Sequence, residues 1–384
     1  GAVAQGGGGI YVAGDINRTY GINSVSRIGS ATENRATVIL RNVVLNDLDV
    51  VKNPVGGVGG AIMVDLADLT IQGGLIANSD ALGTSNSSGG GLAIIHNSIA
   101  NISDTTIAQN TSEKYGGGLF VQGSTINLAG CNLIENETIN TYFGAALFTA
   151  PMVSHNLPVN GVVQDCTFSN NLSLAIYDDD RTDGPINDVR YNNNRFYAGG
   201  DVNAIVYTNP IYPFGLKTVA ELNSLVVTRQ NGISSPKSQV ANTASNEKPT
   251  IGGLFVTPPN LQNYDSSANL VYIGYAWSGN SAYLNGQPIT TEFAGTLAIS
   301  EDGYHTLEVD GEQFSTEVSS AITPSVSFTV STDGTLTTLN WTLESGTLLD
   351  AAIDQGVSIV AVPSGSTQIP TGSDKTYCFY AITA

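Results

Sequence analysis

The chain has 384 residues, of which 41% are hydrophobic and only 12% are charged, and 43 of them are glycine. This composition is typical of a folded, turn-rich β protein and excludes an intrinsically disordered chain. The formal net charge of −19, with only 14 Lys and Arg, argues against nucleic acid and anionic membranes as partners, because both attract basic surfaces. Since no apolar run reaches the roughly 18 residues of a membrane-spanning helix, no transmembrane segment is expected.

The chain opens with a short strand motif, Ile10 to Val12, which follows a run of glycines, and the polar stretch from Asp15 to Arg35 is interpreted as an inserted loop. The glycine-then-strand motif returns at Gly89–Ile94, Gly116–Val121 and Phe143–Phe148. Successive copies lie about 27 residues apart, which indicates a solenoid. Each apolar run alternates with period two and is closed by Gly, Asn, Ser or Asp, so strands and turns are favoured over helices. We predict an all-β fold in which residues 1–212 form a right-handed parallel β-helix of roughly seven or eight coils.

A second motif advances with the first: an apolar residue, another five positions on, and a closing residue eight positions on. Its copies are Leu40/Leu45/Leu48, Thr70/Leu75/Asn78, Ile102/Ile107/Asn110, Leu128/Leu133/Asn136 and Val163/Phe168/Asn171, and Tyr191/Phe196 repeat the first step. In stacked coils Asn78, Asn110, Asn136 and Asn171 would form a ladder in which each side-chain amide bonds to the next turn. Such a ladder has a structural role.

Two short motifs carry a family resemblance. Gly59-Gly60-Ala61-Ile62 and Phe168-Ser169-Asn170-Asn171 are similar to the paired GGA[IL] and FxxN motifs of polymorphic outer membrane protein repeats, found in bacterial autotransporter passengers and other surface β-helices. The resemblance covers residues 6–207. It implies a β-helix fold, and adhesins, lyases and hydrolases all occur on that fold.

Residues 213–257 are predicted to cap the β-helix and to link it to the C-terminal region, because an open end would expose strand edges and an apolar interior. Within them, Leu216 to Leu225 spaces its apolar residues as a short helix. From residue 258 on the glycine motif stops, and Trp277 and Trp341 each begin a series of short strands and turns that ends near a Tyr. This pattern predicts two small Ig-like β-sandwich domains, 258–320 and 321–384, which resemble bacterial surface Ig-like repeats.

The natural protein is expected to have more sequence upstream, with the export signal in it, because residues 6–12 already resemble a coil in mid-pattern. Cys131 and Cys166 occupy the same place in successive coils, so they are either a stacked pair of small apolar residues or a disulfide. Cys378, in the last predicted strand, is interpreted as core.

The densest group of chemical side chains is Asp178, Asp179, Asp180 and Arg181. Neighbouring carboxylates beside an arginine could act as a general acid and base, as in enzymes that cleave polysaccharides, or could hold a Ca²⁺ ion. The alternative is a solvated acidic loop.

Two further groups are candidates for binding or catalysis. The first, Asp65, Asp68, His96, Asp104, Lys114 and Tyr115, could hold the base of a lyase that acts on uronate polymers, with Lys114 and Tyr115 as the pair. The second is an aromatic group, Phe196, Tyr197, Tyr207, Tyr212 and Phe214, whose rings would stack on sugars if exposed and would seat the cap if buried.

Known catalytic and metal-binding motifs are missing from the sequence: neither zinc-ligand spacing, a nucleophile elbow nor a phosphate loop is present. The leading hypothesis is therefore a secreted or cell-surface, monomeric and non-catalytic β-helix protein that acts in adhesion or glycan binding. No cofactor is expected, with a Ca²⁺ ion at the acidic group as the alternative. The alternative is a polysaccharide lyase or glycoside hydrolase with its centre at Asp178–Arg181, and a third is a structural stalk.

Overall fold

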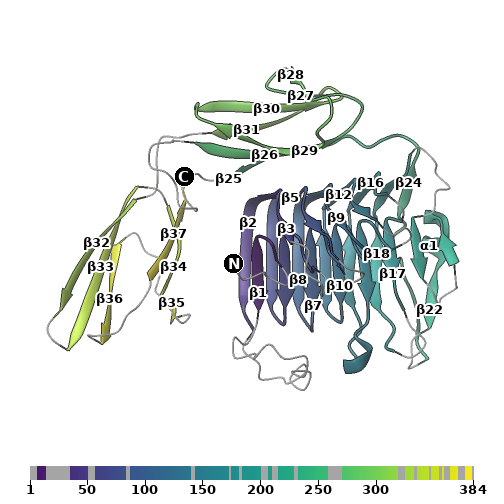
Figure 1. Cartoon of the computed structure of the whole chain (residues 1–384), viewed down its shortest axis with the longest axis horizontal. Helices are drawn as coiled ribbons and strands as arrows, with labels where there is room; N and C mark the ends of the chain where they lie inside the picture. Colours follow the sequence, from purple (N-terminus) through teal and green to yellow (C-terminus); the bar gives the residue numbers. More distant parts are fainter. Residues whose placement is uncertain are drawn as a thin grey trace. The chain divides into compact units, whose positions relative to one another are not determined.

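The computed structural model describes the chain over residues 7–13, 35–50, 57–83, 87–139, 143–172, 174–180, 184–199, 206–209, 215–228, 232–257, 270–318, 325–332, 335–345, 347–353, 357–358, 364–370 and 377–382. Its N-terminal part winds into a parallel β-solenoid of about five turns, with three sheets along the stack (Figure 1).

The parallel part of the first sheet consists of β1 (Ile10–Ala13), β4 (Ile62–Asp65), β7 (Leu92–Ile95), β10 (Leu119–Gln122), β14 (Leu147–Ala150), β17 (Ile176–Asp178) and β20 (Tyr207–Asn209). The second consists of β2 (Thr37–Asn46), β5 (Asp68–Ala77), β8 (Ile99–Ala108), β11 (Thr125–Ala129), β12 (Asn132–Ile134), β15 (Asn160–Gln164), β16 (Thr167–Ser169), β18 (Asp188–Asn192), β19 (Arg195–Tyr197) and β24 (Thr243–Ser245). The third consists of β3 (Asp49–Val50), β6 (Asp80–Ala81), β9 (Thr111–Ser112) and β13 (Glu137–Thr138). A short 3₁₀ helix, η2, spans Val153–His155 between β14 and β15.

The number of turns is lower than the seven or eight predicted. The first sheet has seven parallel strands, β1 to β20, but the third sheet has only four among the described residues. Each strand motif in the sequence corresponds to only one strand of a coil. A motif near either end of the stack can therefore occur without a complete turn around it. Counting motifs therefore overestimates the number of turns.

Single residues in the left-handed conformation turn each coil. The bend along the second sheet lies at Asn42, Gly73, Asp104, Gly130, Asp165 and Asn193, with φ between 46° and 71°. The corner that leads to the third sheet lies at Asp47, Asn78, Gln109, Glu135 and Asn170, with φ between 49° and 59°. Gly, Asn and Asp tolerate this conformation best. They occupy all six bend positions and three of the five corner positions, the exceptions being Gln109 and Glu135.

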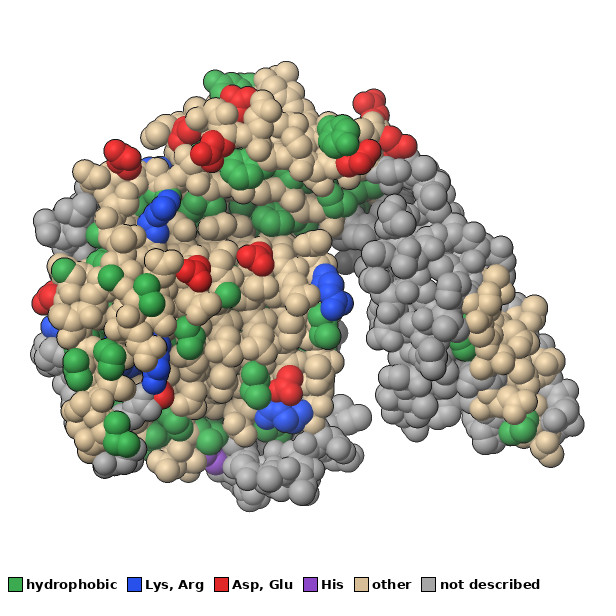
Figure 2. Space-filling model, turned by 180° about the vertical axis from the view of Figure 1, so that it is seen from behind, with side chains coloured by type: hydrophobic (Ala, Val, Ile, Leu, Met, Phe, Trp, Pro, Cys, Tyr) green, Lys and Arg blue, Asp and Glu red, His purple; other side chains and the backbone are tan. Residues whose placement is uncertain are grey.

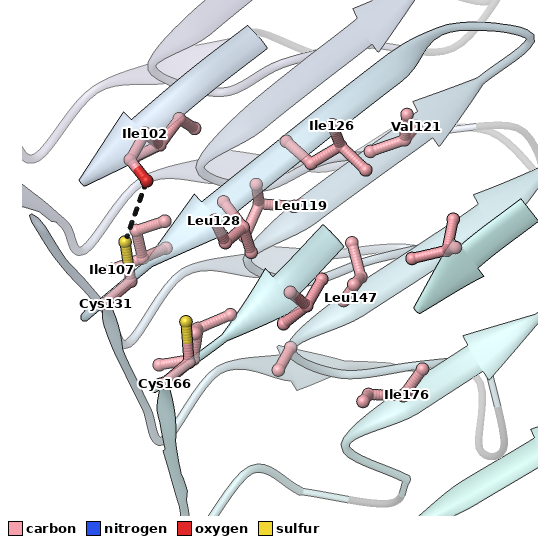
Figure 3. Packing of buried hydrophobic residues seen from close by; sticks show 14 of the residues in the cluster. Ile102, Ile107, Leu119, Val121, Ile126, Leu128, Cys131, Leu147, Cys166 and Ile176 are labelled. Atoms are coloured by element: carbon pink, nitrogen blue, oxygen red, sulfur yellow. Dashed lines mark hydrogen bonds between the residues drawn. The ribbon is translucent and has the colours of Figure 1, made fainter. Parts of the chain in front are cut away.

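The interior of the solenoid is a stack of aliphatic side chains, one layer for each turn (Figure 3). Ile62 pairs with Leu92 and Leu119 with Leu147 in neighbouring strands, so like residues lie above like residues. Cys131 and Cys166 belong to this core as buried free thiols, and the Cys131 thiol donates to the carbonyl oxygen of Ile102 at 3.5 Å. The stacked pair, and not the disulfide, is therefore the alternative observed.

An asparagine ladder runs through the buried corner beside the second sheet. Nδ2 of Asn110 donates to Oδ1 of Asn136 at 3.0 Å, and Nδ2 of Asn136 donates to Oδ1 of Asn171 at 3.1 Å. The same oxygens accept backbone N–H groups of Asn110 and Asn136. Each amide also donates to a backbone carbonyl of the preceding coil, as Asn136 does to Ile107. The ladder thereby satisfies backbone groups that the turns leave without strand partners.

Asn78 lies outside the ladder. It is the left-handed corner residue, and its amide donates to Oδ1 of Asn46 at 2.8 Å and to the carbonyl oxygen of Ala294 at 3.1 Å. The next residue, Ser79, takes the ladder position, and its backbone N–H donates to Oδ1 of Asn110. The Thr70/Leu75/Asn78 motif is thus one residue out of register, since Ile71 pairs with Ile102.

The register was obscured because both faces of β5 are apolar. On its outer face, Leu75 and Ala77 are buried in a second apolar cluster with Ala108, Ile134, Ile251, Ala276 and Ala294. A strand that is buried on both faces loses the alternation of apolar and polar residues that sets its register. The sequence pattern therefore does not decide whether Leu75 or Ile76 faces the interior of the solenoid.

A second ladder at the bend of the second sheet was not predicted. It continues the column of Cys131 and Cys166: the backbone N–H of Cys166 donates to Oδ1 of Asn194 at 3.0 Å, and Nδ2 of Asn194 donates to Oδ1 of Asn242 at 2.9 Å. Because Asn242 comes from the segment after the last coil, this ladder attaches the cap to the stack.

The cap closes the C-terminal end of the solenoid with strands of changed direction. β21 (Gly215–Lys217) pairs antiparallel with β20, which ends the parallel pairing of the first sheet. Helix α1 (Val219–Ser224), within the segment predicted to be helical, begins with a capping box formed by Thr218 and Glu221. β22 (Val226–Thr228) and β23 (Ser234–Pro236) then form a hairpin. Val219, Leu222, Leu225 and Val227 extend the solenoid core.

The remaining strands among the described residues form four small sheets. β25 (Ile251–Thr257), β26 (Val271–Ser278) and β29 (Ala294–Ile299) make one sheet, and β27 (Ala282–Leu284), β28 (Gln287–Pro288), β30 (Gly303–Val309) and β31 (Glu312–Val318) make another. β32 (Ser325–Thr332), β33 (Leu336–Ser345) and β36 (Ser364–Pro370) form the third, and β34 (Thr347–Ile353), β35 (Val357–Ser358) and β37 (Tyr377–Ile382) form the fourth. Trp277 and Trp341 are both buried.

The contacts divide the chain into two compact units. One comprises residues 1–257, 273–297 and 305–316, and the other comprises 258–272, 298–304 and 317–384. The apolar cluster around Leu75 explains why residues 273–297 are grouped with the solenoid, because Ala276 and Ala294 are part of it. The predicted domain boundaries and the Ig-like nature of the C-terminal strands stay predictions.

Replacing Asn136 by Ala should lower the free energy of unfolding by roughly 2–3 kcal/mol, because it leaves buried donors and acceptors of two coils without partners. Urea unfolding followed by circular dichroism measures the change. The matched control is Asn101→Ala, which removes an exposed amide pair with Asn127 and should cost less than about 0.5 kcal/mol. Equal losses in the two variants would show that the ladder does not support the stack.

Candidate functional site

The predicted acidic group lies at the C-terminal end of the solenoid. Asp178 is the last residue of β17, where residues alternate between interior and surface, so Asp178 and Asp180 are 0% and 1% exposed while Asp179 is partly exposed. Arg181 lies outside the described residues. The alternative of a solvated loop is wrong for Asp178 and Asp180, because strand alternation carries both into the interior.

Both oxygens of the Asp178 carboxylate have two donors each. Oδ1 accepts from Oγ1 of Thr149 and from Nδ2 of Asn187, both at 2.9 Å. Oδ2 accepts from the Tyr207 hydroxyl at 3.1 Å and from Nζ of Lys237 at 2.6 Å. A buried carboxylate is stable only when paired and hydrogen-bonded in this way.

Lys237 reaches this carboxylate from the cap. Its side chain is 4% exposed, and its Nζ also donates to the carbonyl oxygen of Asn187 at 3.1 Å. The backbone of Lys237 is fixed on both sides, because its N–H donates to Leu225 and its carbonyl accepts from Tyr191. The pair Asp178–Lys237 is therefore an ion pair inside the solenoid that connects the last coils to the cap.

Asp180 extends the network. Its Oδ1 accepts the backbone N–H of Asn187 at 2.6 Å and its Oδ2 accepts from Nδ2 of Asn209 at 2.7 Å. Burial, and next the charge of Asp178, raise the pKa of Asp180 to about 6, although Lys237 and Asn209 act in the opposite direction. We call Thr149, Asp178, Asp180, Asn187, Tyr207, Asn209 and Lys237 the interior polar network.

The aromatic rings of Tyr191 and Tyr207 lie beside this network. Their centroids are 5.7 Å apart in an edge-to-face arrangement. Burial, followed by the charge of Asp178, raises the pKa of both phenols well above the usual value, so both stay protonated. Tyr207 is 0% exposed, so of the two alternatives for this ring, stacking on sugars or packing against the cap, the buried one is observed. Of the other rings in that group, Tyr197 is half-buried on β19, Phe196 is core, and Tyr212 and Phe214 lie outside the described residues.

A different aromatic group lies on the outer face of the first sheet. It consists of two columns that follow the stacked coils, Tyr115 with Phe143 and Phe120 with Phe148 and Tyr177. Ring centroids are 5.2 Å apart for Tyr115–Phe143, 5.6 Å for Phe120–Phe148 and 5.2 Å for Phe148–Tyr177. We call these five residues the aromatic face.

The aromatic face is partly accessible. Within it, Phe120 and Phe148 are buried, whereas Tyr115, Phe143 and Tyr177 are half-buried. Nζ of Lys114 lies 4.6 Å from the centroid of the Tyr115 ring, so the predicted pair of Lys114 and Tyr115 does come together. Aromatic columns of this kind, with a cation at one edge, offer stacking surfaces and one hydrogen-bond donor.

The sequence carries a signal for this face. The residue after the inward Leu or Ile is aromatic in three successive coils, at Phe120, Phe148 and Tyr177, and these residues pair in register. By contrast, nothing in the sequence around Lys237, Asn187 or Asn209 marks them as partners of Asp178 and Asp180.

The second predicted group separates into two places. Asp65 ends β4, and its Oδ1 lies 2.7 Å from Nδ1 of His96, while the Tyr11 hydroxyl donates to its Oδ2 at 3.4 Å. Asp68 pairs with Arg35 at 2.5 Å. These residues follow the carboxyl ends of the first-sheet strands, whereas Lys114 and Tyr115 precede the amino end of β10. Because the strands are parallel, the two groups lie at opposite edges of that sheet and do not form one site.

Asp104 is a corner residue of the second sheet and joins neither group. Among the described residues, no cluster of three or more His, Cys, Asp or Glu side chains is placed to hold a metal ion. The oxygens of Asp178 and Asp180 instead accept amine, amide and hydroxyl donors.

On the face seen in Figure 2, Lys and Arg side chains are scattered and do not gather into a basic patch. Within the described ranges, no helix combines the length and the apolar character needed to cross a membrane.

Comparison with family models, curated proteins and solved structures found no match to this chain. The similarity to polymorphic outer membrane protein repeats therefore depends on its short motifs alone and stays a prediction.

The titration of Asp180 should make stability fall as the pH rises. Its pKa in the folded state, about 6, is above the ordinary value of 3.8, so the folded state binds more protons between these values. The stabilising contribution is complete below about pH 4 and is lost as the pH rises through about 6, by at most about 3 kcal/mol. Asp180→Asn removes this titration.

The measurement is urea unfolding of the wild type and of Asp180→Asn between about pH 4 and pH 7. The difference in unfolding free energy, wild type minus variant, should decrease with pH. Asp165→Asn, which removes an exposed carboxylate, is the control and should follow the wild type. A difference that is constant with pH would contradict the predicted titration.

Proposed function

We propose that this chain is a secreted or cell-surface, monomeric β-helix protein that binds glycans without cleaving them, in adhesion, and that the aromatic face is its binding surface. The observation that carries the proposal is the pair of aromatic columns on the outside of the first sheet, with three half-buried rings and Lys114 beside them. Aromatic rings outside a solenoid gain nothing from the interior core, so their accumulation on one face supports a binding role.

The geometry of the columns suits an extended polymer. Tyr115 and Phe143 hold the same position in successive coils, since each directly precedes the turn that opens its first-sheet strand. Coils repeat at about 4.8 Å, so the rings form a regular series along the stack. A chain of sugar rings could contact several of them at once, with its apolar ring faces on the aromatic faces and its hydroxyls toward Lys114.

Charge narrows the class of glycan. With a net charge of −19, the protein repels strongly acidic polymers at long range. The single lysine at the edge of the aromatic face supplies a hydrogen-bond donor but does not make the surface basic. We therefore propose neutral, hydroxyl-rich polysaccharide as the ligand.

The burial and hydrogen bonding of Asp178 and Asp180 support a structural role for these carboxylates and not a catalytic one. A glycosidase or lyase needs carboxylates that touch the substrate, whereas these two are 0% and 1% exposed and are engaged by Lys237, Asn187 and Asn209. The interior polar network thus supports the scaffold of the binding surface. We propose the C-terminal strands, each set with a buried tryptophan, as Ig-like spacers.

Tyr115→Ala, Phe143→Ala and Tyr177→Ala should each weaken polysaccharide binding roughly tenfold, since removing a central ring of a binding surface commonly costs more than about 1 kcal/mol. Affinity electrophoresis on a panel of neutral and acidic polysaccharides measures the effect. Tyr304→Ala, which removes a ring that is 74% exposed, is the control and should bind as the wild type does. Unchanged binding in all three variants would overturn the assignment of the aromatic face.

The same panel distinguishes binding from catalysis. We expect the purified protein to release neither reducing ends nor unsaturated sugars from any polysaccharide that it binds. Release that disappears in Asp180→Ala or Asp179→Ala would instead establish the polysaccharide lyase or glycoside hydrolase.

A further inference from the structure

The contact between Lys237 and Asp178 has the geometry of two groups that can react. Nζ of Lys237 and Oδ2 of Asp178 are 2.6 Å apart, and the two side chains are 4% and 0% exposed. Both backbones are fixed, Asp178 by the parallel pairing of β17 with β14 and Lys237 by hydrogen bonds to Leu225 and Tyr191. An amine and a carboxyl group held together in this way have a very high effective concentration toward each other.

We propose that Lys237 and Asp178 condense into an intramolecular amide bond that covalently attaches the cap to the solenoid. Within the ion pair, one proton passes from Nζ to Oδ2, so that a neutral amine faces a carboxylic acid. Nζ then forms a bond to Cγ of Asp178, a second proton passes from Nζ to Oδ2, and the Cγ–Oδ2 bond breaks. One water leaves, and the reaction consumes neither an oxidant nor a cofactor.

The neighbours of Asp178 match the needs of each oxygen. Oδ1, which becomes the amide oxygen, accepts from Thr149 and Asn187, and these two donors would stabilise the negative charge on it during the attack. Oδ2, which leaves as water, accepts from the Tyr207 hydroxyl, and that hydroxyl can relay a proton to it. The two oxygens of the carboxylate are therefore supported in different ways.

The surroundings favour the neutral product. Keeping an ammonium and a carboxylate in a buried site has a large desolvation cost, which an uncharged amide does not have. The tyrosine rings of Tyr191 and Tyr207 exclude solvent from the site. The amide would close a loop between residues 59 apart in the chain, which constrains the unfolded state much as a disulfide does. Asp180 keeps its raised pKa, since burial is the largest cause of that shift.

The test is the intact mass of the purified wild-type chain, measured after denaturation. We expect a mass lower than that of the sequence by one water, and a peptide map in which the peptides that contain Asp178 and Lys237 are joined. An unmodified mass in the folded wild-type protein would overturn the proposal and leave an ion pair only. Because the measurement needs no variant, it cannot fail through misfolding.

Variants then locate the bond. Lys237→Arg should restore the full sequence mass, whereas Lys248→Arg, which changes a lysine that lies over Trp277, should keep the loss of one water. Asp178→Asn should still form the bond and lose ammonia instead of water, a difference that mass spectrometry resolves. Loss of water that persists in Lys237→Arg would assign it to another residue and overturn the proposal. These readouts do not involve glycan binding, so they are independent of the proposed function.

Discussion

The fold depends on one constraint, which is that every coil must turn its corners at residues able to adopt a left-handed backbone. Glycine, asparagine and aspartate do so at the lowest cost, and they occupy most of these positions. Asp104, Gly130, Asp165 and Asn193 occupy the same position in successive coils, at the bend of the second sheet. The strands on either side of the bend therefore have equal directions and can pair in parallel. The backbone groups that the corners leave without strand partners are then satisfied by side chains at fixed positions, which is the physical origin of the asparagine ladder.

The interior changes character along the stack. In the central coils it is aliphatic, with Leu119 and Leu147 layered on each other, and a layer of this kind can be extended indefinitely. Toward the C-terminal end the inward positions become Thr149, Asp178, Tyr191 and Asn209. A polar layer cannot accept another aliphatic coil without leaving donors and acceptors unpaired. It accepts one specific partner, the segment that carries Lys237, so it both ends the repeat and selects the cap.

The outer faces of the solenoid are used differently. The apolar residues outside the second sheet, such as Leu75, are covered by strands of the segment that comes after the cap. The aromatic residues outside the first sheet are covered only in part. Both sheets are parallel stacks of strands with apolar residues on the outer face. A face that other strands cover is a packing surface, whereas a face that is covered only in part is available to a ligand. This difference is why we assign binding to the aromatic face.

The sequence by itself determined the parallel solenoid and three of the ladder asparagines, because these depend on local backbone conformation repeated at a near-constant interval. It also singled out Asp178 and Asp180, and it placed Lys114 beside Tyr115. It did not determine that β5 is covered on both faces, which shifted the register assigned to Asn78, or that Tyr207 is buried. Only the tertiary structure decided that Lys237 enters the solenoid and meets Asp178, because that contact joins segments far apart in the chain, and no local pattern records a distance through space.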